Sequence, residues 1–231
     1  MNILITGGSR GIGRETALSL AADRNNQVLV TGRDEKALRS LEEAAPNENI
    51  SRYVIDFSET GNNYTVFTKH VFSVFSILDI MINNAGSLVN KQFTELSDAE
   101  VRQMMEINYI GPVALIRSLF PLMKKGSHIV NISSMGGYQG SAKFNGLSCY
   151  SASKAAIACL SECLATEFSE YGISVNCLAP GSVATEMLSE AFPGYKAPVS
   201  AREMGGFIAW FATEGGKLFN GKVLPVALTT P

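Results

Sequence analysis

TGGSRGIG, from Thr6 to Gly13, follows directly on the apolar run Ile3–Ile5 near the start of the chain. Glycine loses more backbone entropy on folding than other residues, so this concentration of glycine needs a structural reason. An apolar strand, then glycines, then a helix would bring bare backbone N–H groups and the positive end of a helix to one place, which suits a pyrophosphate. Gly7 would allow the turn, Gly11 would leave room for a phosphate, and Gly13 would let the helix approach the sheet. Taken alone, the stretch also fits a tight strand-to-helix turn without a ligand.

The rest of the chain alternates between short apolar runs and segments with helical spacing. The apolar runs predict strands at 2–6, 27–31, 51–56, 79–83, 128–133, 174–179 and 222–226. Between residues 150 and 168, apolar residues recur every three or four positions, which indicates a helix with one apolar face. Strands separated by helices pair in parallel through right-handed crossovers. We therefore expect an α/β fold, a single Rossmann-like domain over 1–231 with a doubly wound seven-stranded parallel sheet and helices on both faces.

Composition excludes several other classes of protein. The 231 residues are 46% hydrophobic and carry a formal net charge of −2 with scattered Lys and Arg, which argues against nucleic-acid binding. The most apolar stretch, 71–82, is too short and too interrupted to span a membrane. No basic and apolar leader precedes Ile3, so we expect a cytoplasmic protein. Four cysteines without C-x-x-C spacing, and only two histidines, predict reduced structural thiols and no metal site.

Further motifs follow the glycine loop in a fixed order. They are NNAG (83–86), Asn108 in MEINYIG, NISS (131–134), Tyr150-x-x-x-Lys154, APGSVATEM (179–187) and GKVLPV (221–226). With the T-G-x-x-x-G-x-G spacing of the loop, this set resembles the short-chain dehydrogenase/reductase family over essentially the whole chain. The resemblance implies a nicotinamide-dependent oxidoreductase that acts on a small carbonyl or alcohol substrate.

Tyr150 and Lys154 have the spacing that acid–base chemistry needs. Residues four apart share one helix face, with about 5–6 Å between their Cβ atoms. A nearby ammonium favours the phenolate, so we expect it to lower the pKa of Tyr150 from its ordinary value near 10. Tyr150 would then give a proton to a carbonyl oxygen or take one from an alcohol. The resemblance adds that Lys154 holds the nicotinamide ribose.

Ser134 is the candidate to polarise the substrate carbonyl, because it directly ends the predicted strand at 128–133. The serine of the family usually lies closer to its tyrosine than it does here, and the extra residues fall in the loop 135–149. Ser133 is the neighbouring alternative, and Ser141 within the enlarged loop is a further one.

Asn108 lies in a helical run that begins near Ser97, a plausible N-cap. Pro112 has no N–H, so the Asn108 carbonyl loses its normal helical donor and a kink is expected. The resemblance implies that Asn108 joins the catalytic group and links Lys154 to solvent through water.

The end of the second strand favours NADP(H) over NAD(H). Gly32 occupies the place where an NAD site usually offers a carboxylate, and Arg33 follows it. Arg10 adds a second cation, and arginine suits a phosphate because its planar fork bonds it bidentately. Asp34 is acidic and adjacent, but it is better explained as a helix N-cap.

The resemblance also assigns the cofactor contacts. Asp56 and Phe57 resemble the adenine contact, and Thr185 is placed to meet the nicotinamide carboxamide. The full set is Gly7, Ser9, Arg10, Gly11, Ile12, Gly13, Arg33, Asp56, Phe57, Asn83, Ala85, Gly86, Tyr150, Lys154, Pro180, Gly181, Val183 and Thr185.

The substrate is the least defined part of the prediction. The segment after Thr185, which forms a lid in the family, is short here. Phe192, Pro193 and Tyr195 could wall an apolar pocket or anchor a turn, and Lys143, Phe144 and Asn145 of the enlarged loop could replace part of the lid.

Two functions remain open from the sequence. The first is NADPH-dependent reduction of a ketone or 3-oxoacyl group to an alcohol. The second is a non-catalytic sensor or scaffold that binds NADP(H) on the same fold. Apolar residues on the helix of Tyr150 and in 223–228 predict a homotetramer, with a homodimer as the fallback.

Overall fold

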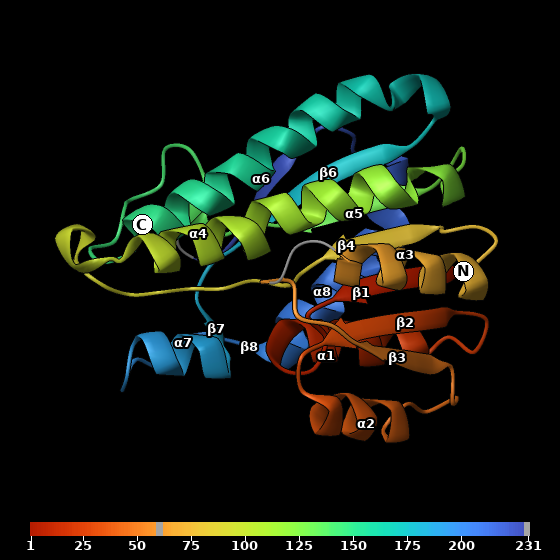
Figure 1. Ribbon diagram of the computed structural model, residues 1–231, viewed down its shortest axis with the longest axis horizontal. Helices are drawn as coiled ribbons and strands as arrows, with labels where there is room; N and C mark the ends of the chain where they lie inside the picture. The colour runs from red at the N-terminus through yellow and green to blue at the C-terminus, as the bar shows by residue number, and fades with distance from the viewer. Residues whose placement is uncertain (59–61, 229–231) are drawn as a thin grey trace.

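A seven-stranded parallel sheet forms the centre of the computed structural model, which describes residues 1–58 and 62–228 (Figure 1). Its strands are β1 (Asn2–Thr6), β2 (Gln27–Gly32), β3 (Ile50–Val54), β4 (Ile80–Asn83), β5 (His128–Ile132), β6 (Ser174–Pro180) and β9 (Val223–Val226). Their order across the sheet is β3-β2-β1-β4-β5-β6-β9. The predicted fold class is thus confirmed, and each predicted strand is found within two residues of its expected ends.

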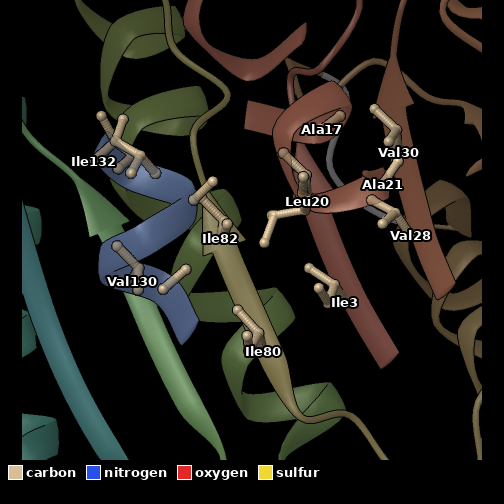
Figure 2. Packing of buried hydrophobic residues seen from close by; sticks show 14 of the residues in the cluster. Ile3, Ala17, Leu20, Ala21, Val28, Val30, Ile80, Ile82, Val130 and Ile132 are labelled. Atoms are coloured by element: carbon tan, nitrogen blue, oxygen red, sulfur yellow. The ribbon is translucent and has the colours of Figure 1, made fainter. Parts of the chain in front are cut away.

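Alternation along the strands divides the core into two layers. Ile3 and Ile5 of β1 belong to one buried cluster, whereas Leu4 between them belongs to the other. The same alternation separates Ile80 and Ile82 of β4 from Met81. Figure 2 shows the first cluster, in which side chains of β1, β2, β4 and β5 meet Ala17, Leu20 and Ala21. Both faces are apolar because a parallel sheet is covered by helices on each side.

The helices lie on both faces of this sheet. They are α1 (Gly11–Ala21), α2 (Glu35–Glu43), α3 (Asn62–Val74), α4 (Asp98–Met105), α5 (Gly111–Leu119), α6 (Ser148–Glu167), α7 (Glu186–Ala191) and α8 (Ala201–Glu214). α1, α2 and α8 cover one face, and α3, α5 and α6 cover the other (Figure 1). Short 3-10 helices span Phe93–Glu95, Phe120–Leu122, Met135–Gly137, Ser169–Tyr171 and Gly215–Lys217.

Side-chain caps fix where several helices begin. Asp34 accepts a hydrogen bond from the Ala37 N–H at 3.0 Å, so its carboxylate is the N-cap of α2 as predicted. Ser97 starts α4 with a reciprocal bond to Glu100, a capping box that satisfies two N–H groups.

Strand order places the functional end of the sheet. β1 lies between β2 and β4, so the chain runs outward from β1 in both directions. The connections from β1 and β4 therefore diverge above their carboxyl ends and leave a crevice, which is where open α/β sheets bind ligands.

Two features were not expected from the sequence. A π-helix, Glu106–Ile110, joins α4 to α5, with the Gly111 N–H bonded to the Glu106 carbonyl five residues back. A second, two-stranded sheet pairs β7 (Val183–Ala184) with β8 (Val199–Ser200) and closes the segment that holds α7 into a loop.

Two further findings concern the membrane and the thiols. Within the described residues, no helix is both long and apolar enough to cross a membrane. All four cysteines are free, but only Cys177 is buried. Cys159 and Cys163 are exposed on α6, so a role in core packing fits neither of them.

Candidate active site

A pocket of about 630 Å³ lies at the carboxyl ends of the strands. It brings together the glycine loop, the ends of β2 to β5, the start of α6 and the segment from Pro180 to Val199. All the predicted cofactor residues line it except Asn83, and so do three of the four predicted catalytic residues: Ser134, Tyr150 and Lys154. Asn108 is buried and is not among the residues that line the pocket. The ordered motifs of the sequence thus converge on one cavity.

The glycine loop is a cradle that side chains would fill. Gly7 has a φ of +70°, and a Cβ there would lie 2.6 Å from the Ala85 Cα. A Cβ at Gly13 would lie 2.3 Å from the Gly7 carbonyl oxygen, so α1 packs tightly on the loop. Arg10, the N-cap residue of α1, makes no side-chain capping bond. The N-terminus of α1 therefore meets the pocket through backbone N–H groups, and these residues fit the pyrophosphate of a dinucleotide.

Asn84 holds this loop in place, a contact that the sequence did not predict. Its amide donates to the carbonyls of Thr6 and Gly7 at 3.1 and 2.8 Å, and the Thr6 hydroxyl accepts from the Asn84 and Ala85 N–H groups. Asn83 instead donates to Asn131 at 2.8 Å within the sheet. The structure therefore places Asn84, and not Asn83, on the cofactor side of the strand.

Tyr150 lies deep in the pocket, and its environment differs from the expectation. Burial raises the pKa of the Tyr150 phenol, and a hydrogen bond with the Ser134 hydroxyl offsets only part of this rise. The expected lowering of the pKa is wrong for this structure, because burial of the phenol is the largest cause of its shift. The nearby Lys154 ammonium donates to the Ile132 carbonyl at 2.8 Å. Tyr150 is therefore held in its protonated form at neutral pH.

Lys154 is a buried cation. Its side chain lines the pocket but is almost fully buried, and burial lowers the pKa of its ammonium from 10.5 to about 8. A Cβ on Gly86 would lie 3.4 Å from the Lys154 Nζ, so glycine at this position keeps the ammonium accessible from the cavity.

The three candidate serines differ in the partners of their hydroxyl groups. The Ser133 hydroxyl donates to the Lys154 carbonyl at 2.6 Å. Ser141 is bonded to the carbonyls of Met135 and Tyr138. Ser134 is the serine whose side chain meets the Tyr150 phenol, so the geometry favours it over both alternatives.

Two glycines allow this approach of β5 to α6. A Cβ on Gly137 would lie 2.5 Å from the Lys154 backbone carbon, and one on Gly136 would lie 2.8 Å from the Ser151 Oγ. The turn Met135–Gly137 can therefore press against the helix that carries Tyr150 and Lys154. This close packing aligns Ser134 with the phenol.

Asn108 acts through its side chain. Its amide exchanges two hydrogen bonds with the Ser87 backbone at 2.8 and 2.9 Å and donates to the Ser153 hydroxyl at 2.8 Å. The predicted disruption before Pro112 is present as the π-helix, which turns Asn108 toward these partners. Asn108 thus ties the segment after β4, at Ser87, to the helix of Tyr150 and Lys154.

The far end of the pocket carries the residues predicted to choose the cofactor. A Cβ on Gly32 would lie 3.0 Å from the Ser9 Cβ, so there is little room for an acidic side chain at that position. Arg33 lies 3.7 Å from the Asp56 carboxylate. Burial would raise the pKa of Asp56, but hydrogen bonds from Ser58 and the charge of Arg33 outweigh it and lower the pKa.

α7 closes over the glycine loop with a charged contact. Arg10 bonds Glu190 of α7 at 2.8 Å, and Glu190 and then Glu186 raise the pKa of its guanidinium. A Cβ on Gly11 would lie 3.3 Å from the Thr185 Cγ2, so Thr185 packs against the loop while its hydroxyl caps α7. Both arginines predicted to meet phosphate are therefore paired with carboxylates in this structure.

Comparison with known proteins points to the same family as the sequence motifs. The family model described as short chain dehydrogenase matches residues 1–196. The L-fucose dehydrogenase of Rattus norvegicus is 33% identical over 192 residues, which are 81% of this chain and 68% of that protein. Dehydrogenase/reductase SDR family member 7B of Mus musculus is 33% identical over 193 residues, which are 80% of this chain but only 58% of that protein.

One solved structure that shares the fold is a complex with a nicotinamide cofactor. The short chain dehydrogenase of Shigella flexneri 2a, solved as a complex with NADP, has a TM-score of 0.87 and 27% identity. The match covers 97% of this chain and 95% of the Shigella chain. With the matched family model, the ordered motifs and the pocket that they build, these likenesses establish that the chain belongs to the short-chain dehydrogenase family of oxidoreductases.

Proposed function

We propose that this protein is an NADPH-dependent carbonyl reductase, with Tyr150 as its general acid. The observation that carries the proposal is the convergence of the Tyr150 phenol, the Ser134 hydroxyl and the buried Lys154 in one pocket with an open glycine loop. A carbonyl group needs a proton donor at its oxygen when it is reduced, and a buried, protonated phenol is such a donor. The nicotinamide, when bound, supplies the hydride.

Each residue then has a defined task. The Ser134 hydroxyl, which lowers the pKa of the neighbouring phenol and accepts from the Gly136 N–H at 3.1 Å, orients the substrate oxygen toward Tyr150. Tyr150 donates its proton to that oxygen as the alcohol forms. Lys154 lies one helical turn away, and a pKa of about 8 places its ammonium near its titration point at physiological pH. It can therefore exchange a proton and stabilise the phenolate that Tyr150 leaves behind.

We also propose a preference for NADP(H). Three observations support it: Gly32 leaves no acidic side chain to hold the ribose hydroxyls, Arg33 lines the pocket beside it, and the Shigella relative is a complex with NADP. A 2′-phosphate would compete with Asp56 for Arg33. Since the Arg33 side chain is 62% exposed, its contribution is that of a surface charge.

The test compares Tyr150→Phe with the unmodified protein. We expect turnover of a ketone by Tyr150→Phe to fall by roughly 10²- to 10⁴-fold, the range for loss of a general acid. NADPH binding, followed by fluorescence titration, should change by less than about twofold, because the cofactor is held by backbone N–H groups of the loop. Tyr171→Phe is the matched control, since Tyr171 is half exposed and lies outside the pocket lining.

Two outcomes would contradict the proposal. Near-normal turnover by Tyr150→Phe would remove the phenol from the chemistry. NADPH binding by the unmodified protein without oxidation by any ketone or aldehyde would favour the non-catalytic sensor or scaffold.

A further inference from the structure

The end of the pocket next to Tyr150 is walled by apolar side chains from three separate segments. They are Leu88, Phe144, Leu147, Met187, Phe192 and Tyr195. Leu88 and Phe192 pack directly on the buried pair of Leu147 and Tyr150. Phe144 and Tyr195 are about half exposed at the opening. Apolar surface of this kind, left open beside a reacting group, is what a ligand covers.

The polar groups around this wall bond to one another and not into the cavity. Asn90 donates to the Ala191 carbonyl at 2.8 Å, which ties the segment after β4 to the end of α7. The Lys91 N–H donates to the Gly146 carbonyl at 3.1 Å, which ties the same segment to the enlarged loop. The Asn90 amide nitrogen and the Lys91 N–H are therefore both engaged with backbone carbonyls.

The remaining polar side chains at the opening are also engaged. The Tyr195 hydroxyl donates to the Ser182 Oγ at 3.3 Å. The exposed Lys143 is not among the pocket-lining residues, and its ammonium donates to the Gly136 and Tyr138 carbonyls at 3.0 and 2.7 Å.

Charged side chains line other parts of the cavity, apart from Lys154, which lies one helical turn from Tyr150. Among the described residues, the charged side chains that line the pocket are Arg10, Arg33, Asp56, Lys154 and Glu186. Arg33 and Asp56 lie at the ends of β2 and β3, and Arg10 and Glu186 lie at the glycine loop. Lys154 is bonded to the Ile132 carbonyl. A carboxylate or phosphate on the substrate would therefore find no charged partner on the apolar wall.

From this arrangement we infer the substrate class, an inference that rests on the proposed reductase function. The substrate is an uncharged ketone or aldehyde with an apolar, aromatic-sized body, whose carbonyl is its one strongly polar group. Ser134 and Tyr150 match that carbonyl, and the apolar wall matches the body. Acidic and polyhydroxylated carbonyl compounds are disfavoured, because each charge or hydroxyl would be buried without a hydrogen-bond partner. In the reaction, the carbonyl carbon gains a hydride from NADPH, which becomes NADP⁺, and the carbonyl oxygen gains the Tyr150 proton, which solvent replaces.

The first experiment compares acetophenone, 4-acetylbenzoate and dihydroxyacetone as substrates with NADPH. We expect kcat/KM for acetophenone to exceed that for each of the others by at least about 30-fold. Burying one polar group without a hydrogen-bond partner is expected to lower kcat/KM by about this factor. A preference for the carboxylate or for the hydroxylated ketone would overturn the inference while leaving the reductase function intact.

A binding readout separates the two claims. Ligand-observed NMR on Tyr150→Phe with NADP⁺ measures the affinities of acetophenone and 4-acetylbenzoate without turnover. Tighter binding of acetophenone, with no compound reduced by the unmodified protein, would refute the proposed function and support the pocket chemistry. Equal or weaker binding of acetophenone would overturn the inference.

A charge placed on the wall supplies a second test. Phe144→Arg adds a cation at a half-exposed position that tolerates it. We expect the ratio of kcat/KM for 4-acetylbenzoate to that for acetophenone to rise about tenfold, as for one charge-assisted bond. Phe93→Arg is the matched control, because Phe93 is 71% exposed and does not line the pocket. An equal shift in both variants, or none in Phe144→Arg, would contradict the assigned wall.

Discussion

Replacing Lys154 by methionine should make the protein inactive but change its stability in a pH-dependent way. The folded protein binds the Lys154 proton with a pKa of about 8, against 10.5 in the reference state. Below pH 8 both folded and unfolded chains carry the proton, and the folded chain bears the full cost of burying it. Between pH 8 and 10.5 the unfolded chain holds more protons than the folded chain. The unfolding free energy of the unmodified protein therefore increases with pH relative to that of the variant.

The size of this effect follows from the two pKa values. At 1.36 kcal/mol per pKa unit, the shift corresponds to a burial cost of about 3 kcal/mol, most of which is relieved between pH 7.5 and 10. Over that range, the difference in unfolding free energy between Lys154→Met and the unmodified protein should move by about 2 kcal/mol in favour of the unmodified protein. Packing changes that do not depend on pH cancel, as do alkaline titrations of groups that do not interact with Lys154. The buried Cys177 thiol does interact with it, but burial raises the pKa of that thiol to about 11, above the range compared.

Urea unfolding at pH 7.5, 8.5, 9.5 and 10, followed by circular dichroism, measures this difference. Lys36→Met, which removes an exposed lysine on α2, is the matched control for the loss of a surface cation. A pH-independent difference between Lys154→Met and the unmodified protein would refute a buried, pKa-shifted ammonium. A change of the opposite sign would show that folding stabilises the cation.

Three further predictions concern the cofactor and assembly. Arg33→Ala should weaken NADPH binding by about five- to tenfold and NADH binding by less than twofold, because one exposed arginine contacts the 2′-phosphate. Equal losses of affinity for both cofactors in fluorescence titrations would contradict this. Glu190→Gln should tighten NADPH binding about two- to fourfold by releasing Arg10, an effect that 0.5 M salt should largely remove; unchanged affinity at low salt would show that the Arg10 contact does not compete with the cofactor. Light scattering at micromolar concentration should show a homotetramer or homodimer, supported by the exposed Trp210 and Leu218 near the C-terminal strand, whereas a monomer alone would reject the prediction.

The fold was predictable because its signals are local. The continuous apolar runs of β1 and β4, and the glycines after β1, depend only on neighbouring residues, and they located the strands and the crevice. Asn84 shows the limit of this kind of reasoning. The motif indicated that an asparagine at the end of β4 supports the site, but only the observed contacts show that Asn84 meets the glycine loop while Asn83 meets Asn131.

The features that the sequence did not predict depend on contacts between distant segments. The pKa of Tyr150 is raised because packing buries it, and the spacing to Lys154 says nothing about that burial. The ion pair of Arg10 with Glu190 joins residues that are 180 positions apart. The roles of Ser134, Lys154 and Asn108 in catalysis remain predictions that the geometry supports.

The most direct test of the account is hydride transfer itself. The unmodified protein is incubated with acetophenone and NADPH that carries deuterium at the reactive C4 position, and the alcohol is examined by mass spectrometry and NMR. The account predicts one deuterium at the carbinol carbon of a single enantiomer, formed at least about 10²-fold more slowly by Tyr150→Phe at equal NADPH saturation. Unlabelled alcohol, or labelled alcohol formed equally well by Tyr150→Phe, would contradict it.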